Sequence, residues 1–228
     1  MRIKLIALIL LIITQFPAWA QRPSDVLVEG SSGMVGMSEK RLQLLDQFIQ
    51  EYVIKGYIPG GVFLVARDNQ IVYNKTFGFR STDKKVPYRK DDIFRICSMT
   101  KAITSVAIMQ LYEEGKLGLD DAVQDYIPAF KKTQVLDTFN EKDSTYTTVP
   151  VKSPITLRQL LTHTSGIAYG DFYPGKIMAV YKKNNMLGVG LSHPSWTTEE
   201  FINRLAAVPL AFQPGDRFMY GLNMDVLG

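Results

Sequence analysis

The first clear hydrophobic periodicity lies between Ser38 and Gly56. Leu42, Leu45 and Ile49 belong to a series in which apolar residues recur every three or four positions. That spacing is typical of an amphipathic helix, with serine favoured as its N-terminal cap and glycine favoured just beyond its end. The pattern predicts a surface helix with one buried face.

A different pattern follows, in which apolar residues run without interruption. Residues 62–66 form a continuous apolar run, a polar turn follows at 67–70, and apolar residues 71–73 then lead on to Phe77 and Gly78. Two such runs around a short polar turn predict two antiparallel strands. Beyond a polar connector, the segment Ile93–Cys97 is apolar again and is predicted to be extended and buried.

Residues 98–114 carry apolar side chains on nearly every face, and Gly115 follows as a stop. A helix of this kind is usually buried nearly all round. Ser98 is therefore expected where an extended segment leads into a central helix.

The rest of the chain is richer in loops and short helices. Residues 131–153 are mostly polar and predict a surface excursion. Capping-box patterns at residues 156–159 and 197–200 mark two further helix starts. No internal repeat or low-complexity tract is present.

The N-terminus has the composition of a secretory leader: a basic start, an apolar run over residues 5–13, and small residues around Ala20. That run is about half of the roughly 20 residues that span a bilayer. We expect a signal peptide over residues 1–20, cleaved after Ala20, then a flexible segment over 21–36 and one domain over 37–228. The protein is expected to be exported to the periplasm or the medium, without a stable membrane anchor after cleavage.

Composition narrows the function classes further. The chain has 228 residues, 46% of them hydrophobic and 21% charged, as in ordinary globular proteins. Losing Arg2 and Lys4 with the leader lowers the formal net charge from +4 to +2. Lysine pairs are scattered and not interleaved with aromatic residues, which argues against a nucleic-acid partner. A single cysteine excludes an internal disulfide, and two histidines are too few for a histidine-rich metal site.

Candidate chemistry lies at the start of the predicted central helix. Ser98 and Lys101 are three residues apart, so a helix projects both side chains from one face. Burial lowers the pKa of a lysine, which could then accept the serine proton. The helix start also favours negative charge near Ser98. The alternative is structural, with Ser98 as a helix cap and Lys101 extending to solvent.

The chain contains its own comparison for this motif. Ser81 and Lys84 have the same spacing but lie in a polar connector. Only Ser98 stands between an apolar extended segment and an apolar helix, so context separates the two pairs.

Three blocks of sequence, in order, resemble serine β-lactamase-like proteins, namely residues 94–128, 155–166 and 214–228. They read FRICSMTK with LYEEGKL, LDD and YIP; ITLRQLLTHTSG; and PGDRFMY with DVLG. The family includes class C β-lactamases, penicillin-binding carboxypeptidases, D-amino-acid peptidases and carboxylesterases. The resemblance implies an α+β fold of the β-lactamase/transpeptidase type, an antiparallel sheet flanked by helices plus a helical region.

The resemblance also implies an acyl-enzyme mechanism. In it Ser98 is the nucleophile, Lys101 its base and Tyr220 a second proton-transfer group. No cofactor or metal is implied. The expected partner is a small ester, a β-lactam or a peptidoglycan-derived substrate.

Two departures from the family pattern qualify this expectation. The family usually has an asparagine two places after the tyrosine, where it contacts a substrate amide. Here that place is Leu222, with Asn223 next, which favours ester substrates and makes both candidate substrate-binding residues. A Lys-Thr-Gly or His-x-Gly strand motif beyond the tyrosine is also absent. The C-terminal strands and half of the oxyanion hole are therefore expected to be missing, as in a truncated product.

Other readings are less favoured. A Ser-His hydrolase of the α/β type needs a Gly-x-Ser-x-Gly run, which does not occur, so His163 is expected to be structural. Cys97 is expected to be a buried small residue and not a nucleophile. The remaining alternatives are a non-catalytic β-lactam or cell-wall sensor on the same fold, or an inactive truncated product.

Overall fold

A computed structural model describes residues 27–81, 83–188 and 195–228. The predicted leader and its cleavage point lie outside these ranges. The chain divides into two compact units, one ending at Arg95 and the other running from Ile96 to Gly228.

The first unit is built on a small sheet. Its strands are β1 (Val28–Glu29), β2 (Gly60–Arg67), β3 (Gln70–Ser81) and β4 (Val86–Pro87), in the order β1-β3-β2 with β4 also paired to β3. β2 and β3 are antiparallel, which confirms the predicted pair of strands, while β1 runs parallel to β3. The turn between β2 and β3 contains Asp68 and Asn69 with positive φ.

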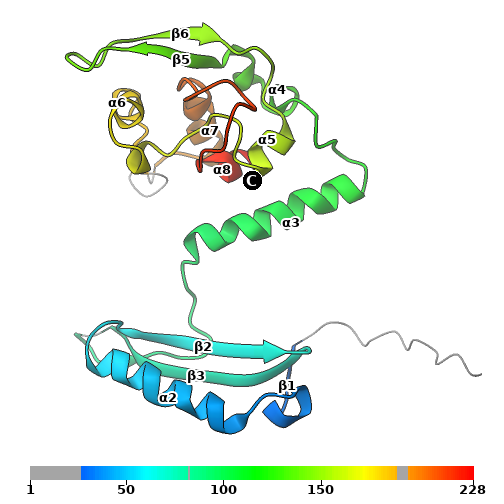
Figure 1. Cartoon of the computed structure of the whole chain (residues 1–228), viewed down its shortest axis with the longest axis vertical. Helices are drawn as coiled ribbons and strands as arrows, with labels where there is room; N and C mark the ends of the chain where they lie inside the picture. The colour runs from blue at the N-terminus through cyan, green and yellow to red at the C-terminus, as the bar shows by residue number, and fades with distance from the viewer. Residues whose placement is uncertain (1–26, 82, 189–194) are drawn as a thin grey trace, which may run out of the picture. The chain divides into compact units, whose positions relative to one another are not determined.

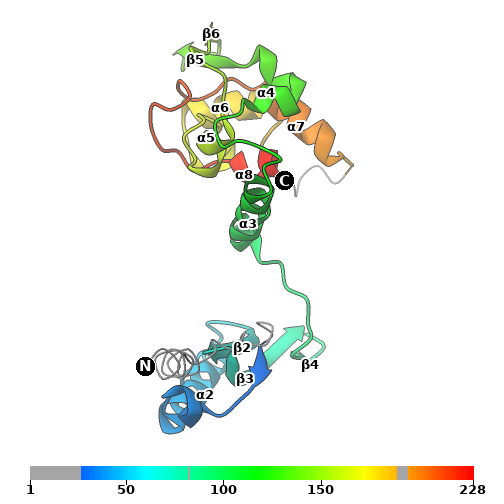
Figure 2. The same cartoon turned by 90° about the vertical axis from the view of Figure 1, so that its right-hand side faces the viewer.

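Helix α2 (Glu39–Ile54) lies along one face of this sheet (Figure 2). Its buried residues include Leu42 and Ile49, and the Ser38 side chain accepts a hydrogen bond from the Arg41 amide. The prediction of an amphipathic helix capped by Ser38 is confirmed.

Residues 27–36 differ from the flexible segment expected over 21–36. They form β1 and the 3₁₀ helix η1 (Ser32–Val35), in which Val35 is buried. The amides of Val28 and Gly30 donate to carbonyls of β3 or its turn. Backbone pairing at a sheet edge needs no side-chain pattern, so hydrophobic periodicity does not reveal it.

The segment Ile93–Cys97 was predicted to be extended and buried, and the second half of that prediction is wrong. Residues 93–96 form no regular helix or strand, and the Ile93 side chain is 99% exposed. An apolar run favours burial, but burial also requires another element that packs against it.

The second unit begins with the 3₁₀ turn η2 (Cys97–Met99) and helix α3 (Thr100–Glu113). The helix is where the sequence predicts it, but it is not buried nearly all round. Ile108 is its buried residue, whereas Ile103 and Val106 are 62% and 60% exposed. Within its own unit α3 packs mainly against α8 (Asn223–Leu227), and this contact does not cover Ile103 and Val106.

The remaining elements of this unit surround a common hydrophobic core (Figure 1). They are α4 (Val123–Tyr126), η3 (Pro128–Lys132), β5 (Gln134–Phe139), β6 (Tyr146–Pro150), α5 (Leu157–Leu161), η4 (Gly170–Phe172), α6 (Lys176–Lys183) and α7 (Thr198–Ala206). Leu160, Val180 and Leu222 are among the most completely buried residues. α8 packs against both α3 and α5, which links the helix that begins beside Ser98 to the core.

Two local features of this unit test the sequence patterns. The predicted capping box at Thr156 and Gln159 is present with both of its hydrogen bonds, and Thr197 caps α7. The excursion at 131–153, by contrast, contains the antiparallel pair β5 and β6, with Val135 buried. Taken together, strands and separate helices give the expected α+β composition. None of the helices that the structure describes is long and apolar enough to cross a membrane.

Candidate functional site

Ser98 lies in the short turn that leads into α3. The preceding residue, Cys97, has φ +47°, a left-handed conformation that is uncommon outside glycine. Such outliers are frequent at functional sites, where the surrounding structure holds them. Ser98 is exposed at this turn. Cys97 is also exposed, so the expectation that it is buried is wrong.

Lys101 lies one helical turn further along α3, as its spacing predicts. Its Nζ atom donates to Ser98 Oγ at 3.4 Å and to the Tyr169 hydroxyl at 3.1 Å. The ammonium group also lies 5.0 Å from the centre of the Tyr220 ring. The Lys101 ammonium therefore has a shorter hydrogen bond to Tyr169 than to Ser98.

Tyr220 comes from a segment 122 residues away along the chain, yet its hydroxyl lies 2.7 Å from Ser98 Oγ. A hydroxyl can both donate and accept, so a proton can pass in either direction across this hydrogen bond. The structure thus brings together the three residues that the resemblance implied, Ser98, Lys101 and Tyr220.

The direction of the Lys101 pKa differs from the expectation. Burial alone disfavours the charged ammonium, but hydrogen bonds and charge interactions with Tyr169 and Tyr220 outweigh it and raise the Lys101 pKa above its ordinary value of 10.5. The expectation that burial lowers this pKa is wrong, because Lys101 is only partly buried and has two oxygen partners. At neutral pH the side chain is a cation.

Tyr220 shows the complementary shift. Burial disfavours its phenolate, but hydrogen bonds with Ser98 and Lys101 and the charge of Lys101 lower the Tyr220 pKa below its ordinary value of 10.0. A cation beside a phenol favours the deprotonated form of the phenol. The electrostatics therefore favour Tyr220 over Lys101 as proton acceptor for Ser98.

Sequence reasoning missed Tyr169. Its hydroxyl accepts the hydrogen bond from Lys101, and its ring lies 5.5 Å from that of Tyr220. Burial of the phenol raises the Tyr169 pKa, while the charge of Lys101 opposes this. The available signal was its position just after the THTSG run, within a block that already resembled the family.

Leu222 and Asn223, which were expected to contact substrate, lie in the interior instead. Both have zero exposed fraction, so neither side chain reaches a surface that a substrate could contact in the described structure. Leu222 belongs to the hydrophobic core. The Asn223 amide donates to His163 Nδ1 at 2.9 Å and accepts from the Ser165 hydroxyl. The substrate-binding assignment is therefore corrected to an interior role for both residues.

His163 is buried beside this group, as expected for a structural histidine. Burial and the nearby charge of Lys101 lower its pKa below the ordinary value of 6.5, so the imidazole is neutral at pH 7. Asp225, on α8, has its pKa raised by burial, with the charge of Lys101 acting in the opposite direction.

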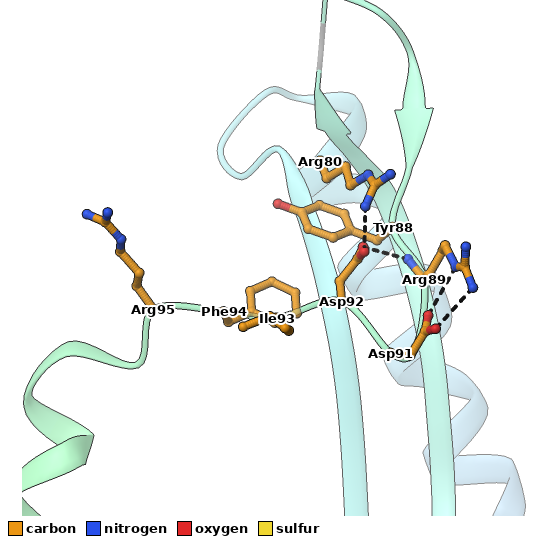
Figure 3. A pocket seen from close by; sticks show the side chains of 8 residues that line it. All are labelled: Arg80, Tyr88, Arg89, Asp91, Asp92, Ile93, Phe94 and Arg95. Atoms are coloured by element: carbon orange, nitrogen blue, oxygen red, sulfur yellow. Dashed lines mark hydrogen bonds and ion pairs between the residues drawn. The ribbon is translucent and has the colours of Figure 1, made fainter.

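A second polar cluster lies in the first unit, around the residues before Arg95. Figure 3 shows that its charges are satisfied internally: Arg80 pairs with Asp92 at 2.8 Å, and Arg89 forms two hydrogen bonds with Asp91. Among the residues labelled in Figure 3, no nucleophilic side chain is paired with a base, so this cluster is not a candidate catalytic site. Within the described ranges, no three His, Cys, Asp or Glu residues are grouped so as to hold a metal ion.

Comparison with known proteins identifies the family. The family model described as Beta-lactamase matches residues 45–228. Protein Rv1367c of Mycobacterium tuberculosis is 38% identical over 181 residues, which cover 79% of this chain and 42% of that protein.

Two solved structures extend the comparison. EstCE1, described as a hydrolase with promiscuous acyltransferase activity, is 33% identical with a TM-score of 0.68, over 82% of this chain and 45% of its own. Simvastatin synthase (LovD) from Aspergillus terreus is 28% identical with a TM-score of 0.65, over 84% and 46%. The chain thus spans less than half the length of each of these relatives. The family match, which covers most of the chain, shows that this protein belongs to the β-lactamase family.

Proposed function

We propose that the protein is a serine hydrolase that forms an acyl-enzyme on Ser98. The observation that carries the proposal is the placement of the Tyr220 hydroxyl 2.7 Å from Ser98 Oγ with the Lys101 ammonium beside both. A serine is a weak nucleophile unless an adjacent group removes its proton, and this cluster supplies such a group.

In the first step, the Ser98 hydroxyl proton moves to the phenolate oxygen of Tyr220 as Oγ attacks the substrate carbonyl carbon. Lys101 stays protonated throughout and stabilises the phenolate by its charge, while Tyr169 holds the ammonium in place. This assigns the base to Tyr220 and the electrostatic role to Lys101. General-base catalysis of this kind contributes typically 10²- to 10⁴-fold.

In the second step, the tetrahedral intermediate collapses and the bond to the leaving group breaks. The Tyr220 hydroxyl returns its proton to the leaving oxygen or nitrogen, which leaves an ester on Ser98. The Ser98 amide, at the start of α3, is the oxyanion donor that the chain supplies. A water molecule then gives a proton to the Tyr220 phenolate and attacks the acyl carbon. The bond between that carbon and Ser98 Oγ breaks, Tyr220 returns the proton to Oγ, and the carboxylic acid leaves.

We propose a small carboxylic ester as the substrate, with β-lactams and D-amino-acid amides as the alternatives. Leu222 stands where amide-processing relatives carry an asparagine, and the Asn223 side chain is fully buried, where it is hydrogen-bonded to His163 and Ser165. EstCE1 and LovD, whose descriptions name hydrolase, acyltransferase and synthase activities, support acyl transfer on this fold. We also propose export after cleavage behind Ala20, which N-terminal sequencing of secreted protein would check.

The test is intact-mass analysis after incubation with a fluorophosphonate, which labels activated serines. The matched control is Ser81, which has the same spacing to a lysine but whose Oγ accepts a hydrogen bond from the Lys84 backbone amide. An adduct on the wild type and on Ser81→Ala, lost in Ser98→Ala, is the expected result.

Other outcomes separate the alternatives. An adduct that survives Ser98→Ala, or its absence from folded wild-type protein, would overturn the proposal. A stable penicillin adduct without hydrolysis of p-nitrophenyl esters would instead indicate a sensor.

A further inference from the structure

We infer that His163 is a positioning residue that fixes Tyr220 over Ser98 by binding the backbone on both sides of the tyrosine and packing its ring against the phenol. The inference rests on the proposed function, since it concerns the geometry of the proposed base. No role in the reaction follows for His163 from the sequence.

The backbone contacts come first. The Met219 amide donates to the His163 carbonyl oxygen at 2.8 Å, and the Gly221 amide donates to His163 Nδ1 at 3.2 Å. These two amides flank Tyr220. One residue therefore anchors the chain immediately before and after the tyrosine, which limits rotation of the segment that carries it.

The imidazole ring adds a third contact. Its centre lies 4.9 Å from that of the Tyr220 ring, with an angle of 32° between the ring planes. Aromatic pairs at such separations attract one another beyond the effect of their buried area. The ring thus limits the tilt of the phenol whose oxygen touches Ser98 Oγ.

Buried neighbours determine the protonation state of this histidine. The Asn223 amide group donates to Nδ1, and its Oδ1 accepts from Ser165, so the asparagine is oriented with its nitrogen towards the ring. Ser165 Oγ in turn accepts from the Ile167 amide. With two donors directed at it, Nδ1 must be an acceptor, which requires the neutral ring with its proton on Nε2.

The other side of the tyrosine segment is closed by close packing. A Cβ atom added to Gly221 would lie 2.0 Å from the Ile167 carbonyl oxygen, well inside any permitted contact. The segment is therefore held against residue 167 on one side and against His163 on the other.

The backbone of His163 suggests a sharp set of variants. Its φ is +55°, a conformation that asparagine tolerates better than most residues. Asparagine also carries an acceptor, Oδ1, near the place of Nδ1. His163→Asn keeps both anchors, His163→Phe keeps the ring but not the acceptor, and His163→Ala keeps neither side-chain contact.

The experiment measures two quantities on the full chain for each variant. One is kcat and KM for p-nitrophenyl butyrate. The other is the titration of the Tyr220 phenol, followed by NMR of protein labelled at tyrosine Cζ and assigned with Tyr220→Phe. The titration reports the position of the phenol whether or not the protein turns over an ester.

We expect His163→Ala and His163→Phe to lower kcat by roughly 10²-fold with little change in KM, because a small misplacement of a catalytic group costs about that much. In both, the Tyr220 pKa should return towards its ordinary value, whereas His163→Asn should retain most of the wild-type titration. An unchanged Tyr220 titration in His163→Ala and His163→Phe would overturn the inference.

A measurement on the wild type guards against variants that fail to fold. Imidazole ¹⁵N spectra, assigned with His193→Gln, should show His163 Nδ1 unprotonated at pH 7, and a protonated Nδ1 would overturn the inference. Failure of the proposed function would appear differently, as wild-type protein that does not react at Ser98 although Tyr220 and His163 titrate as expected.

Discussion

Tyr220 and Lys101 have pKa values displaced in opposite directions, and in the proposed mechanism the reactive state is a phenolate beside an ammonium. The Tyr220 pKa lies below 10.0 and the Lys101 pKa above 10.5. As pH rises through the Tyr220 pKa, the phenolate accumulates. As pH rises further through the Lys101 pKa, the ammonium that stabilises the phenolate is lost.

The rate of Ser98 labelling by a fluorophosphonate should therefore rise with pH along a limb centred below pH 10, and fall only above about pH 10.5. Stopped incubations analysed by mass would trace this profile. Tyr220→Phe should remove the rising limb and lower the plateau by about 10²- to 10⁴-fold. A rising limb that persists in Tyr220→Phe and disappears in Lys101→Met would instead make the lysine the base.

Tyr169 is a test of how the ammonium is held. Tyr169→Phe removes the 3.1 Å hydrogen bond to Lys101 but keeps the ring beside Tyr220. We expect the Tyr220 pKa to rise, because a less restrained cation stabilises the phenolate less, and the labelling rate at pH 7 to fall by roughly tenfold, as for loss of about 1.4 kcal/mol. Tyr126→Phe, which removes a hydrogen bond from an exposed tyrosine to Asp121 and touches none of these residues, is the matched control. An equal loss in both variants would argue against a specific role for Tyr169.

At the scale of elements, α8 supports the site through its buried first turn. Leu222 caps this helix and is completely buried in the core. Leu222→Ala should lower the free energy of unfolding by about 2 to 5 kcal/mol, because it deletes buried methyl groups and leaves a cavity. Denaturant unfolding of the second unit, followed by a probe within it, would measure the change.

The control for Leu222 is Val106→Ala on α3, whose side chain is 60% exposed and whose truncation should change stability by no more than about 0.5 kcal/mol. If Leu222→Ala is equally mild but raises KM severalfold, residue 222 contacts substrate as the sequence first indicated.

The elements also show what a sequence pattern can and cannot predict. α2 and the β2–β3 pair follow from local periodicity and turn residues, and both are confirmed. Ser98 and Lys101 are close because a helix turn places them together. The partnership of Lys101 with Tyr169 spans 68 residues, so no local spacing contains it.

Other features depend on neighbours that a pattern does not specify. The apolar composition of α3 predicted burial. Composition shows that the side chains favour a buried environment, but it does not show which element packs against them. The backbone pairing of β1 and the interior position of Asn223 were missed for the same reason.

At the scale of the whole molecule, the side of α3 that its own unit leaves uncovered is the main feature to test. Ile103 and Val106 stand on a helix whose own unit covers a different face. Contiguous exposed apolar surface on a soluble protein marks an interaction site or an aggregation liability. If this side of α3 stays uncovered in the whole protein, the protein should bind hydrophobic dyes and self-associate.

Ile103→Glu should reduce 8-anilinonaphthalenesulfonate fluorescence and shift light scattering towards the monomer, with a change in melting behaviour within experimental error. Thr162→Glu, at an exposed polar position of the same unit, controls for added charge. A large loss of stability in Ile103→Glu would mean that another part of the chain covers this face.

The sequence separation of 122 between Ser98 and Tyr220 has a consequence for how the folding chain acquires activity. Ser98 and Lys101 become neighbours as soon as helix α3 forms, which takes on the order of a microsecond. Tyr220 reaches them only after distant segments of the chain have come together and closed a long loop. On refolding, helical content should therefore return before reactivity does. A chain in which only the helix has formed would carry a serine that is not yet activated, and formation of the contact with Tyr220 would be the last step that makes it reactive.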